Sequence, residues 1–67
     1  MLNMNEKTRK FLSENLPDAL KSDDIGVVLR MLYELIDEKG FAPPHYYEYN
    51  DFGREAQKAY DDLYYSN

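Results

Sequence analysis

Hydrophobic residues recur at helical spacing in three segments of this chain. In the first segment, residues 4–16, Met4, Phe11, Leu12 and Leu16 fall on one stripe of a helix. Pro17 ends this segment because a proline disfavours helical backbone at the residue before it. Residues 17–20 then predict one short helical turn with proline at its first position.

Polar residues that cap helices precede the first two segments. Asn3 and Glu6 have the spacing of a capping box, which places the start of the first helix near Asn3. Ser22 or Asp23 is expected to cap the second helix, since both types favour that position.

The second segment, residues 23–39, has the strongest helical pattern. It ends in Lys39, Gly40 and Phe41, and the glycine is free to adopt the left-handed conformation that closes many helices. The apolar residues cover an arc of about 200°. They are Ile25, Val28, Leu29, Met31, Leu32, Tyr33, Leu35 and Ile36. An arc this wide requires neighbours on two sides, or it leaves a strip for a partner.

The third segment, residues 51–64, begins at Asn50 or Asp51 and carries a narrower apolar stripe. The stripe consists of Phe52, Ala56, Ala59, Tyr60 and Leu63. Its two alanines permit another helix to approach closely. The chain is therefore predicted to be a single all-α domain, residues 1–67, folded as a small three-helix bundle with short connections.

The connector, residues 41–50, contains two consecutive prolines followed by a tyrosine-rich stretch. Pro43 and Pro44 impose extended backbone. The stretch 46–49 has β character, but no other segment resembles a strand that could pair with it. We therefore expect an extended connector that places its tyrosines on the bundle.

An alternative fold follows from a resemblance to the second half of winged-helix repressors. The stretches 32–41, 46–49 and 53–56 resemble a recognition helix ending in glycine, a β wing and a Gly-Arg-x-Ala helix, and they cover about half of the chain. The resemblance implies a degenerate α+β winged helix that binds DNA. The chain departs from that pattern in a short wing without a basic tip. It also departs in acids at and along the expected recognition helix, namely Asp23, Asp24, Glu34, Asp37 and Glu38.

The charge of the chain is negative, and the excess lies in its second part. The net charge is −5; residues 1–21 hold four bases and three acids, whereas residues 22–67 hold four bases and ten acids. Phosphates and anionic lipids attract basic surfaces, so this charge argues against nucleic acid and membranes as partners. The chain lacks cysteine, a signal-peptide pattern and an apolar run of about 20 residues, which together favour a cytoplasmic protein.

The sequence offers little reactive chemistry, and we expect neither an enzyme nor a cofactor or metal site. Without cysteine, His45 is the only candidate imidazole base. His45, Glu48 and Asp51 recur every three residues, but successive side chains of an extended segment point to opposite sides, so this spacing does not converge on a metal ion. The adjacent acid pairs diverge by about 100° on a helix and form no catalytic dyad.

Tyrosine is the most informative residue type, with seven in 67 residues. Its ring gives rigid contact area and its hydroxyl a polar tip, and it is enriched at protein interfaces. The competing interpretation is that these rings cover a small core. The candidate interaction surface is Tyr33, Tyr46, Tyr47, Tyr49, Tyr64, Tyr65 and Val27.

These observations favour a small acidic protein-interaction or regulatory domain, for example an accessory protein of a phage or mobile element. Its partner is another protein or a second copy of the chain. A first alternative is a DNA mimic whose carboxylates occupy phosphate positions on a nucleic-acid-binding protein. A second is the DNA-binding function that the winged-helix resemblance implies.

Overall fold

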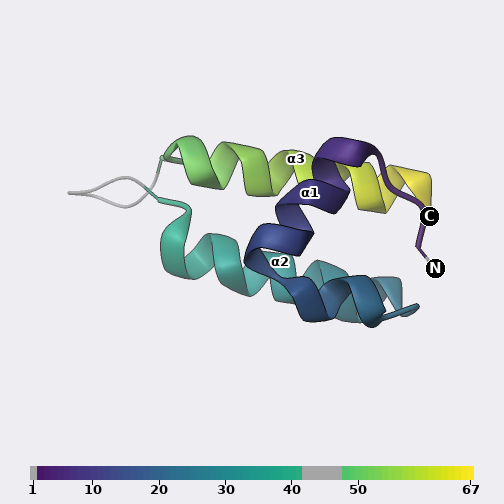
Figure 1. The fold of residues 1–67 in the computed structure, drawn as a ribbon. Helices are drawn as coiled ribbons and strands as arrows, with labels where there is room; N and C mark the ends of the chain where they lie inside the picture. Colours follow the sequence, from purple (N-terminus) through teal and green to yellow (C-terminus); the bar gives the residue numbers. More distant parts are fainter. Residues whose placement is uncertain (1, 42–47) are drawn as a thin grey trace.

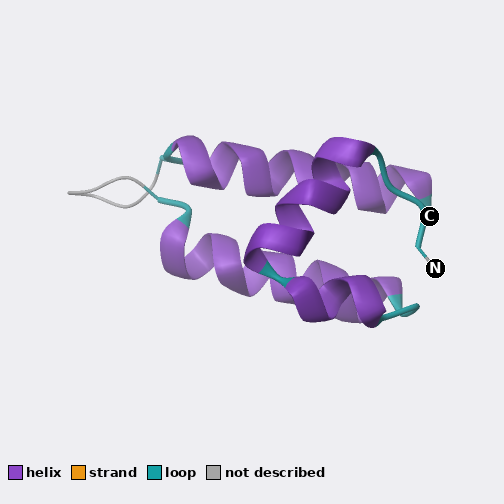
Figure 2. Ribbon diagram, in the orientation of Figure 1, coloured by secondary structure: helices purple, strands orange, loops and turns teal. Residues whose placement is uncertain are grey.

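Helices make up most of the part of the chain that the computed structural model describes, residues 2–41 and 48–67. In chain order they are α1 (Glu6–Asn15), the 3-10 helix η1 (Pro17–Lys21), α2 (Ile25–Lys39) and α3 (Asp51–Ser66) (Figure 1). Within those residues there is no strand, and only an isolated antiparallel bridge joins Phe41 to Tyr49 (Figure 2). The all-α prediction is therefore confirmed, and the α+β alternative is wrong for this part of the chain.

The helices α2 and α3 form an antiparallel hairpin, and α1 crosses one side of it. In Figure 1, α1 lies obliquely in front of the pair, and η1 then runs along α2. Pro17 occupies the first turn of η1, as predicted, and Leu16 leaves helical geometry with ψ of 65°. The break at Leu16 lets the chain turn from α3, on which α1 packs, to α2.

The core lies between the hairpin and the elements that cross it. The three helices and η1 all contribute apolar side chains that are at most 9% exposed. They are Phe11, Leu12, Ala19, Val28, Leu32, Leu35, Ile36, Ala56, Ala59 and Leu63. The two alanines of α3, Ala56 and Ala59, are both buried in this core, and α2 and α3 form the most extensive helix pair.

The capping residues differ from those that the sequence predicted. Asn5 rather than Asn3 caps α1, and its side chain accepts the N–H of Thr8 at 2.8 Å. Asn3 instead ties the two ends of the chain together, because its N–H donates to Oδ1 of Asn67 at 2.9 Å and its carbonyl accepts from Nδ2 of Asn67 at 2.7 Å. A tertiary contact 64 residues away thus outcompetes the local capping box.

At α2, Asp24 provides the cap, one residue later than predicted. Its Oδ1 accepts the N–H groups of Gly26 and Val27 at 3.0 and 3.4 Å. Ser22 supports this cap because its hydroxyl accepts the N–H of Asp24 at 3.1 Å. The first turn of α2 is therefore held by two successive polar side chains.

Gly40 ends α2, but for a different reason from the one expected. Its φ of −89° and ψ of −2° are right-handed rather than left-handed. A Cβ at Gly40 would lie 2.7 Å from the carbonyl oxygen of Ile36 and 3.1 Å from the Cα of Gly53. Glycine is needed here because the backbones of α2 and α3 touch at this point.

Asn50 joins α2 to α3 at the connector end of the hairpin. Its Oδ1 accepts the N–H of Gly53 at 2.7 Å, which caps α3, and its Nδ2 donates to the carbonyl of Lys39 at 2.7 Å. Its own N–H donates to the carbonyl of Gly40 at 2.9 Å. One residue therefore satisfies backbone groups at the end of α2 and at the start of α3.

Candidate functional site

The hairpin has one side that no described segment covers, opposite the side on which α1 lies. Toward α1, α3 presents Phe52 and Ala59, and away from it α3 presents Gln57 and Tyr60. The uncovered side carries aromatic and aliphatic residues from α2, α3 and the ends of the connector. We call this set the open face: Leu29, Tyr33, Phe41, Tyr49, Tyr60 and Tyr64.

Helix geometry explains why these residues share one side. Tyr60 and Tyr64 stand four residues apart on α3, and Leu29 and Tyr33 stand four apart on α2, so each pair forms a stripe. Because the helices run antiparallel from the contact of Gly40, Tyr60 lies level with Tyr33 and Tyr64 lies level with Leu29.

The tyrosines of this face are exposed to very different extents. Tyr33 is 67% exposed, Tyr64 60% and Tyr49 37%, whereas Tyr60 packs half-buried against the core. The half-buried Leu29 and Phe41 extend the apolar surface between and beside these rings. The face therefore joins to the core at its base and presents aromatic rings to the solvent.

A pocket of about 280 Å³ is sunk into the open face near the connector end of the hairpin. Tyr33 and Tyr60 form its sides, and the buried side chain of Ile36 also lines it. Phe41 and Tyr49 close one end, with ring centroids 5.2 Å apart. The pocket is thus apolar, with a polar margin.

That margin is a chain of hydrogen bonds along α3. The hydroxyl of Tyr49 donates to Oε1 of Gln57 at 3.0 Å, and Nε2 of Gln57 donates to Oδ1 of Asp61 at 2.9 Å. These bonds fix the ring of Tyr49, which the connector supplies, against α3. The prediction that the connector places tyrosines on the bundle is confirmed for Tyr49.

Charged residues border the open face on both edges, with opposite signs two turns apart. On α2 the pair is Arg30 and Asp37, and on α3 it is Arg54 and Asp61. Each pair is separated by seven residues, so both members lie on the same side of their helix, about 10 Å apart. All four residues are exposed, and Asp37 also lines the pocket.

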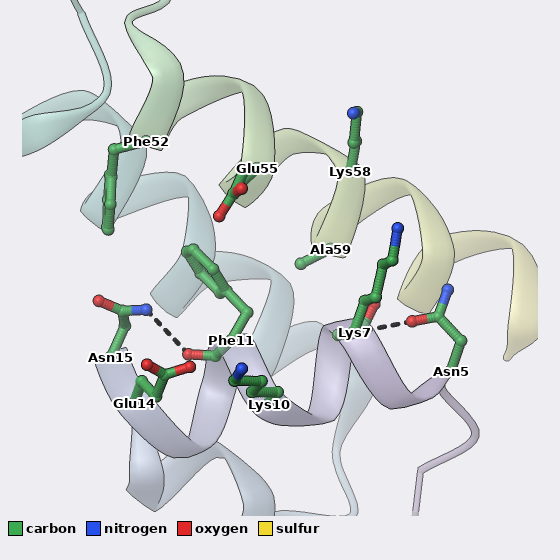
Figure 3. Close-up of a pocket in the computed structure, with 11 residues that line it drawn as sticks. Asn5, Lys7, Lys10, Phe11, Glu14, Asn15, Phe52, Glu55, Lys58 and Ala59 are labelled. Atoms are coloured by element: carbon green, nitrogen blue, oxygen red, sulfur yellow. Dashed lines mark hydrogen bonds between the residues drawn. The ribbon is translucent and has the colours of Figure 1, made fainter.

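A second concavity, a groove of about 510 Å³, lies on the other side of the molecule between α1 and α3. Figure 3 shows Phe11 and Phe52 facing each other on its floor, and their ring centroids are 5.4 Å apart. The side chains of Lys7 and Lys58 extend away from these rings (Figure 3).

The groove has no single electrostatic preference. Its rim holds three lysines and two glutamates, which are Lys7, Lys10, Lys58, Glu14 and Glu55. In the described part of the chain, no buried side-chain nitrogen or oxygen is left without a hydrogen bond, so no polar atom is poised there for a ligand. The open face is the more distinctive surface because its exposed groups are of one chemical kind.

The predicted interaction residues separate into three groups. Tyr33, Tyr49 and Tyr64 belong to the open face, and Tyr65, which is 83% exposed, meets Tyr64 edge-on at 5.2 Å. Val27 is 47% exposed but lies about 120° around α2 from Tyr33, so it faces elsewhere. Tyr46 and Tyr47 lie outside the described residues, as does His45.

Sequence reasoning missed Tyr60, Leu29 and Phe41 as members of this surface. Tyr60 and Leu29 belong to the apolar stripes that predict their helices, and both pack half-buried against the core. The available signal was the width of the apolar arc on α2, which indicated either neighbours on two sides or an uncovered strip, without choosing between them. Among residues 2–41 and 48–67, no three His, Cys, Asp or Glu side chains gather as a metal site.

Comparisons with protein-family models, with curated proteins and with solved structures return no match to this chain. None of the helices in the described part is both long enough and apolar enough to cross a membrane.

Proposed function

We propose that this chain is a small protein-interaction module, and that the open face is its binding surface. The observation that carries the proposal is the apolar pocket that the exposed rings of Tyr33 and Tyr49 line, with Tyr64 exposed one turn beyond Tyr60 on α3. Contiguous exposed apolar surface is uncommon on a soluble monomer and marks interaction sites, whereas isolated exposed rings are ordinary.

The residue types support a protein partner. Tyrosine loses little conformational entropy when it is buried, and its hydroxyl can keep a hydrogen bond at the rim of an interface. Binding energy at protein interfaces is concentrated in a few aromatic and arginine residues around a pocket. The open face has aromatic rings around its pocket and the exposed Arg30 on α2, whereas Arg54 on α3 donates to Oδ1 of Asp51 at 3.0 Å within the chain.

The acidic exterior supports selectivity rather than affinity. With a net charge of −5, the chain attracts basic partners over a longer range and repels acidic ones. Exposed charges contribute little free energy individually, so the rings of the open face supply most of the binding free energy.

The proposal is tested by comparing which proteins the chain captures when single faces are altered. A Tyr33→Ser/Tyr64→Ser variant removes two exposed rings of the open face, and Val27→Ser removes an exposed side chain from another side of α2. We expect proteins captured by the unaltered chain from a lysate of its native host to be lost with the tyrosine variant and kept with Val27→Ser.

Mass spectrometry with quantified peptides reads out the comparison, and far-UV circular dichroism shows that both variants remain folded. Identical sets of captured proteins for the two variants would show that binding, if any, does not use the open face.

A further inference from the structure

We infer that the pocket of the open face receives an arginine side chain from a basic protein partner. This inference rests on the proposed function and names the chemistry that the surface recognises. The pocket volume of about 280 Å³ lies just below the range of roughly 300–1,000 Å³ that is typical of small-molecule sites. The pocket therefore suits one inserted side chain better than a whole small molecule.

The rings that line the pocket suit a cation. Tyr33 stands on α2, Tyr60 on α3 and Tyr49 at the end of the connector, so tyrosines line the pocket from three segments. The face of an aromatic ring carries negative charge density and attracts a cation that lies over it within about 6 Å. The buried Ile36 adds an apolar wall, and the removal of water around a cation strengthens this attraction.

The one charged group among the described residues that line the pocket is acidic. It is Asp37, which is exposed and stands one turn after Tyr33 on α2. Within the described ranges no side chain donates a hydrogen bond to the carboxylate of Asp37, whereas Gln57 donates one to Asp61 at 2.9 Å. The carboxylate of Asp37 is therefore available to a cation that enters between the rings.

The charges around the pocket favour the same sign of partner. Glu34 and Asp61, each one residue after a pocket tyrosine, are exposed, and Arg30, the base on this side of α2, lies two turns before Asp37. The guanidinium of Arg54 on α3 is held in an ion pair at 3.0 Å within its own helix. The net charge of −5 adds a longer-range attraction for a basic partner, and an acidic partner would be repelled.

Arginine fits this pocket better than lysine. Its guanidinium is planar and stacks on aromatic rings, and it is more weakly hydrated than an ammonium group, so it loses less hydration when it enters an apolar pocket. The same group can donate two parallel hydrogen bonds to one carboxylate. An arginine between Tyr33 and Tyr60 would thus meet both the rings and the carboxylate of Asp37, which line one pocket.

NMR titration of the intact, isotope-labelled chain with the blocked peptide acetyl-Gly-Arg-Gly-amide tests the inference. The control peptide carries citrulline, which has nearly the same shape as arginine but no charge. We expect the arginine peptide to shift the amide signals of the pocket residues with a Kd in the millimolar range. The citrulline peptide should bind about fivefold more weakly or less, because it lacks the cation that the rings and the carboxylate attract.

Single substitutions show whether the pocket is the site. Asp37→Asn and Tyr33→Leu should each raise the Kd of the arginine peptide about threefold to fivefold, because they remove the carboxylate and one aromatic face. Glu38→Gln is the matched control, since it removes the same charge from a residue that does not line the pocket and lies about 100° further around α2. It should leave the Kd unchanged.

Four results would overturn the inference. They are no shift of the pocket signals by the arginine peptide, equal binding of the arginine and citrulline peptides, equal effects of Asp37→Asn and Glu38→Gln, and a lysine peptide that binds as tightly as the arginine peptide. The last result would assign the pocket to an ammonium group. None of these removes the proposed interaction function, which fails only if the Tyr33→Ser/Tyr64→Ser and Val27→Ser variants capture the same proteins.

Discussion

Gly40 and Gly53 bring the backbones of α2 and α3 into direct contact at the connector end of the hairpin. A Cβ at Gly53 would overlap the carbonyl oxygen of Gly40 and lie 2.8 Å from its carbonyl carbon. Both residues are buried. The contact sets the spacing of the two helices on which the open face depends, because Tyr33 and Tyr60 border one pocket only while α2 and α3 remain this close.

Gly53→Ala is therefore expected to destabilise the fold. The added methyl group meets backbone rather than a movable side chain, so the helices must separate, and overpacking of this kind costs about 1–3 kcal/mol. Chemical denaturation measures the change in the free energy of unfolding. Gly26→Ala is the matched control: a Cβ there would meet only Oδ1 of Asp24, the end of a movable side chain, at 3.3 Å, and alanine favours a helix by up to about 1 kcal/mol, so we expect a much smaller loss than at Gly53.

Replacement of Asn50 tests its bridging of the two helices. Asn50→Ala removes the cap of α3 and the bond to the carbonyl of Lys39, and should cost about 1–3 kcal/mol of unfolding free energy. Asn50→Ser keeps a capping hydroxyl but is too short to reach Lys39, and should cost roughly 1 kcal/mol less than alanine. If serine matches the unaltered chain, the bond to Lys39 contributes nothing.

Two adjacent valines on α2 differ in burial, and replacing each of them tests how α2 is oriented on the core. Val28 is fully buried, whereas Val27 is 47% exposed. Val28→Ala is expected to cost about 2 kcal/mol, because it removes two buried methyl groups and leaves a void, and Val27→Ala should change the free energy of unfolding by less than about 0.5 kcal/mol. Thermal unfolding of the two variants at equal concentration reads out the difference; equal losses would contradict the placement of α2.

The carboxylate of Asp62 makes the free energy of unfolding depend on pH. It accepts the N–H of Asn5 at 2.9 Å, and this bond, together with those from the hydroxyls of Thr8 and Ser66, outweighs a small desolvation and holds the pKa of Asp62 below its usual value of 3.8. A carboxyl group with a lowered pKa stabilises the folded state above its unfolded pKa, and the contribution disappears as pH falls through the folded value.

Asp62→Asn should therefore be less stable than the unaltered chain at pH 7, by about 1 kcal/mol on the scale of one hydrogen bond. The difference should shrink as the pH is lowered from about 4 downward. Urea denaturation at several pH values, with Asp61→Asn as the adjacent control, checks this. A difference that stays constant down to pH 2 would mean that the charge of Asp62 is irrelevant to folding.

The sequence alone was sufficient to locate the helices, because each helix has a local cause. Apolar spacing located all three, Pro17 located the break after α1, and Asn50 was one of the two expected starts of α3. These signals act over one or two turns, so no knowledge of the fold is required to read them. The predicted bounds 4–16, 23–39 and 51–64 differ from the observed ones by at most two residues at each end.

Sequence reasoning erred where a distant part of the chain competes for the same group. Asn3 was taken as a cap, but it binds Asn67. Local spacing predicts a left-handed Gly40 and assigns Gly53 no packing role, yet each is glycine because of the other. Neither relationship leaves a trace in local spacing, since the two glycines stand 13 residues apart on separate elements.

The same distinction between local and tertiary causes applies to the candidate surface. From the sequence alone, this chain is predicted to be an acidic helical domain rich in tyrosine with a wide apolar arc on its second helix, because composition and periodicity are local properties. Only the tertiary structure decided that Tyr33, Tyr49 and Tyr60 line one pocket while Val27 faces elsewhere. The physical reason is that the register of α2 on α3 and the side taken by α1 are set by packing between distant residues, and packing determines which apolar side chains remain uncovered.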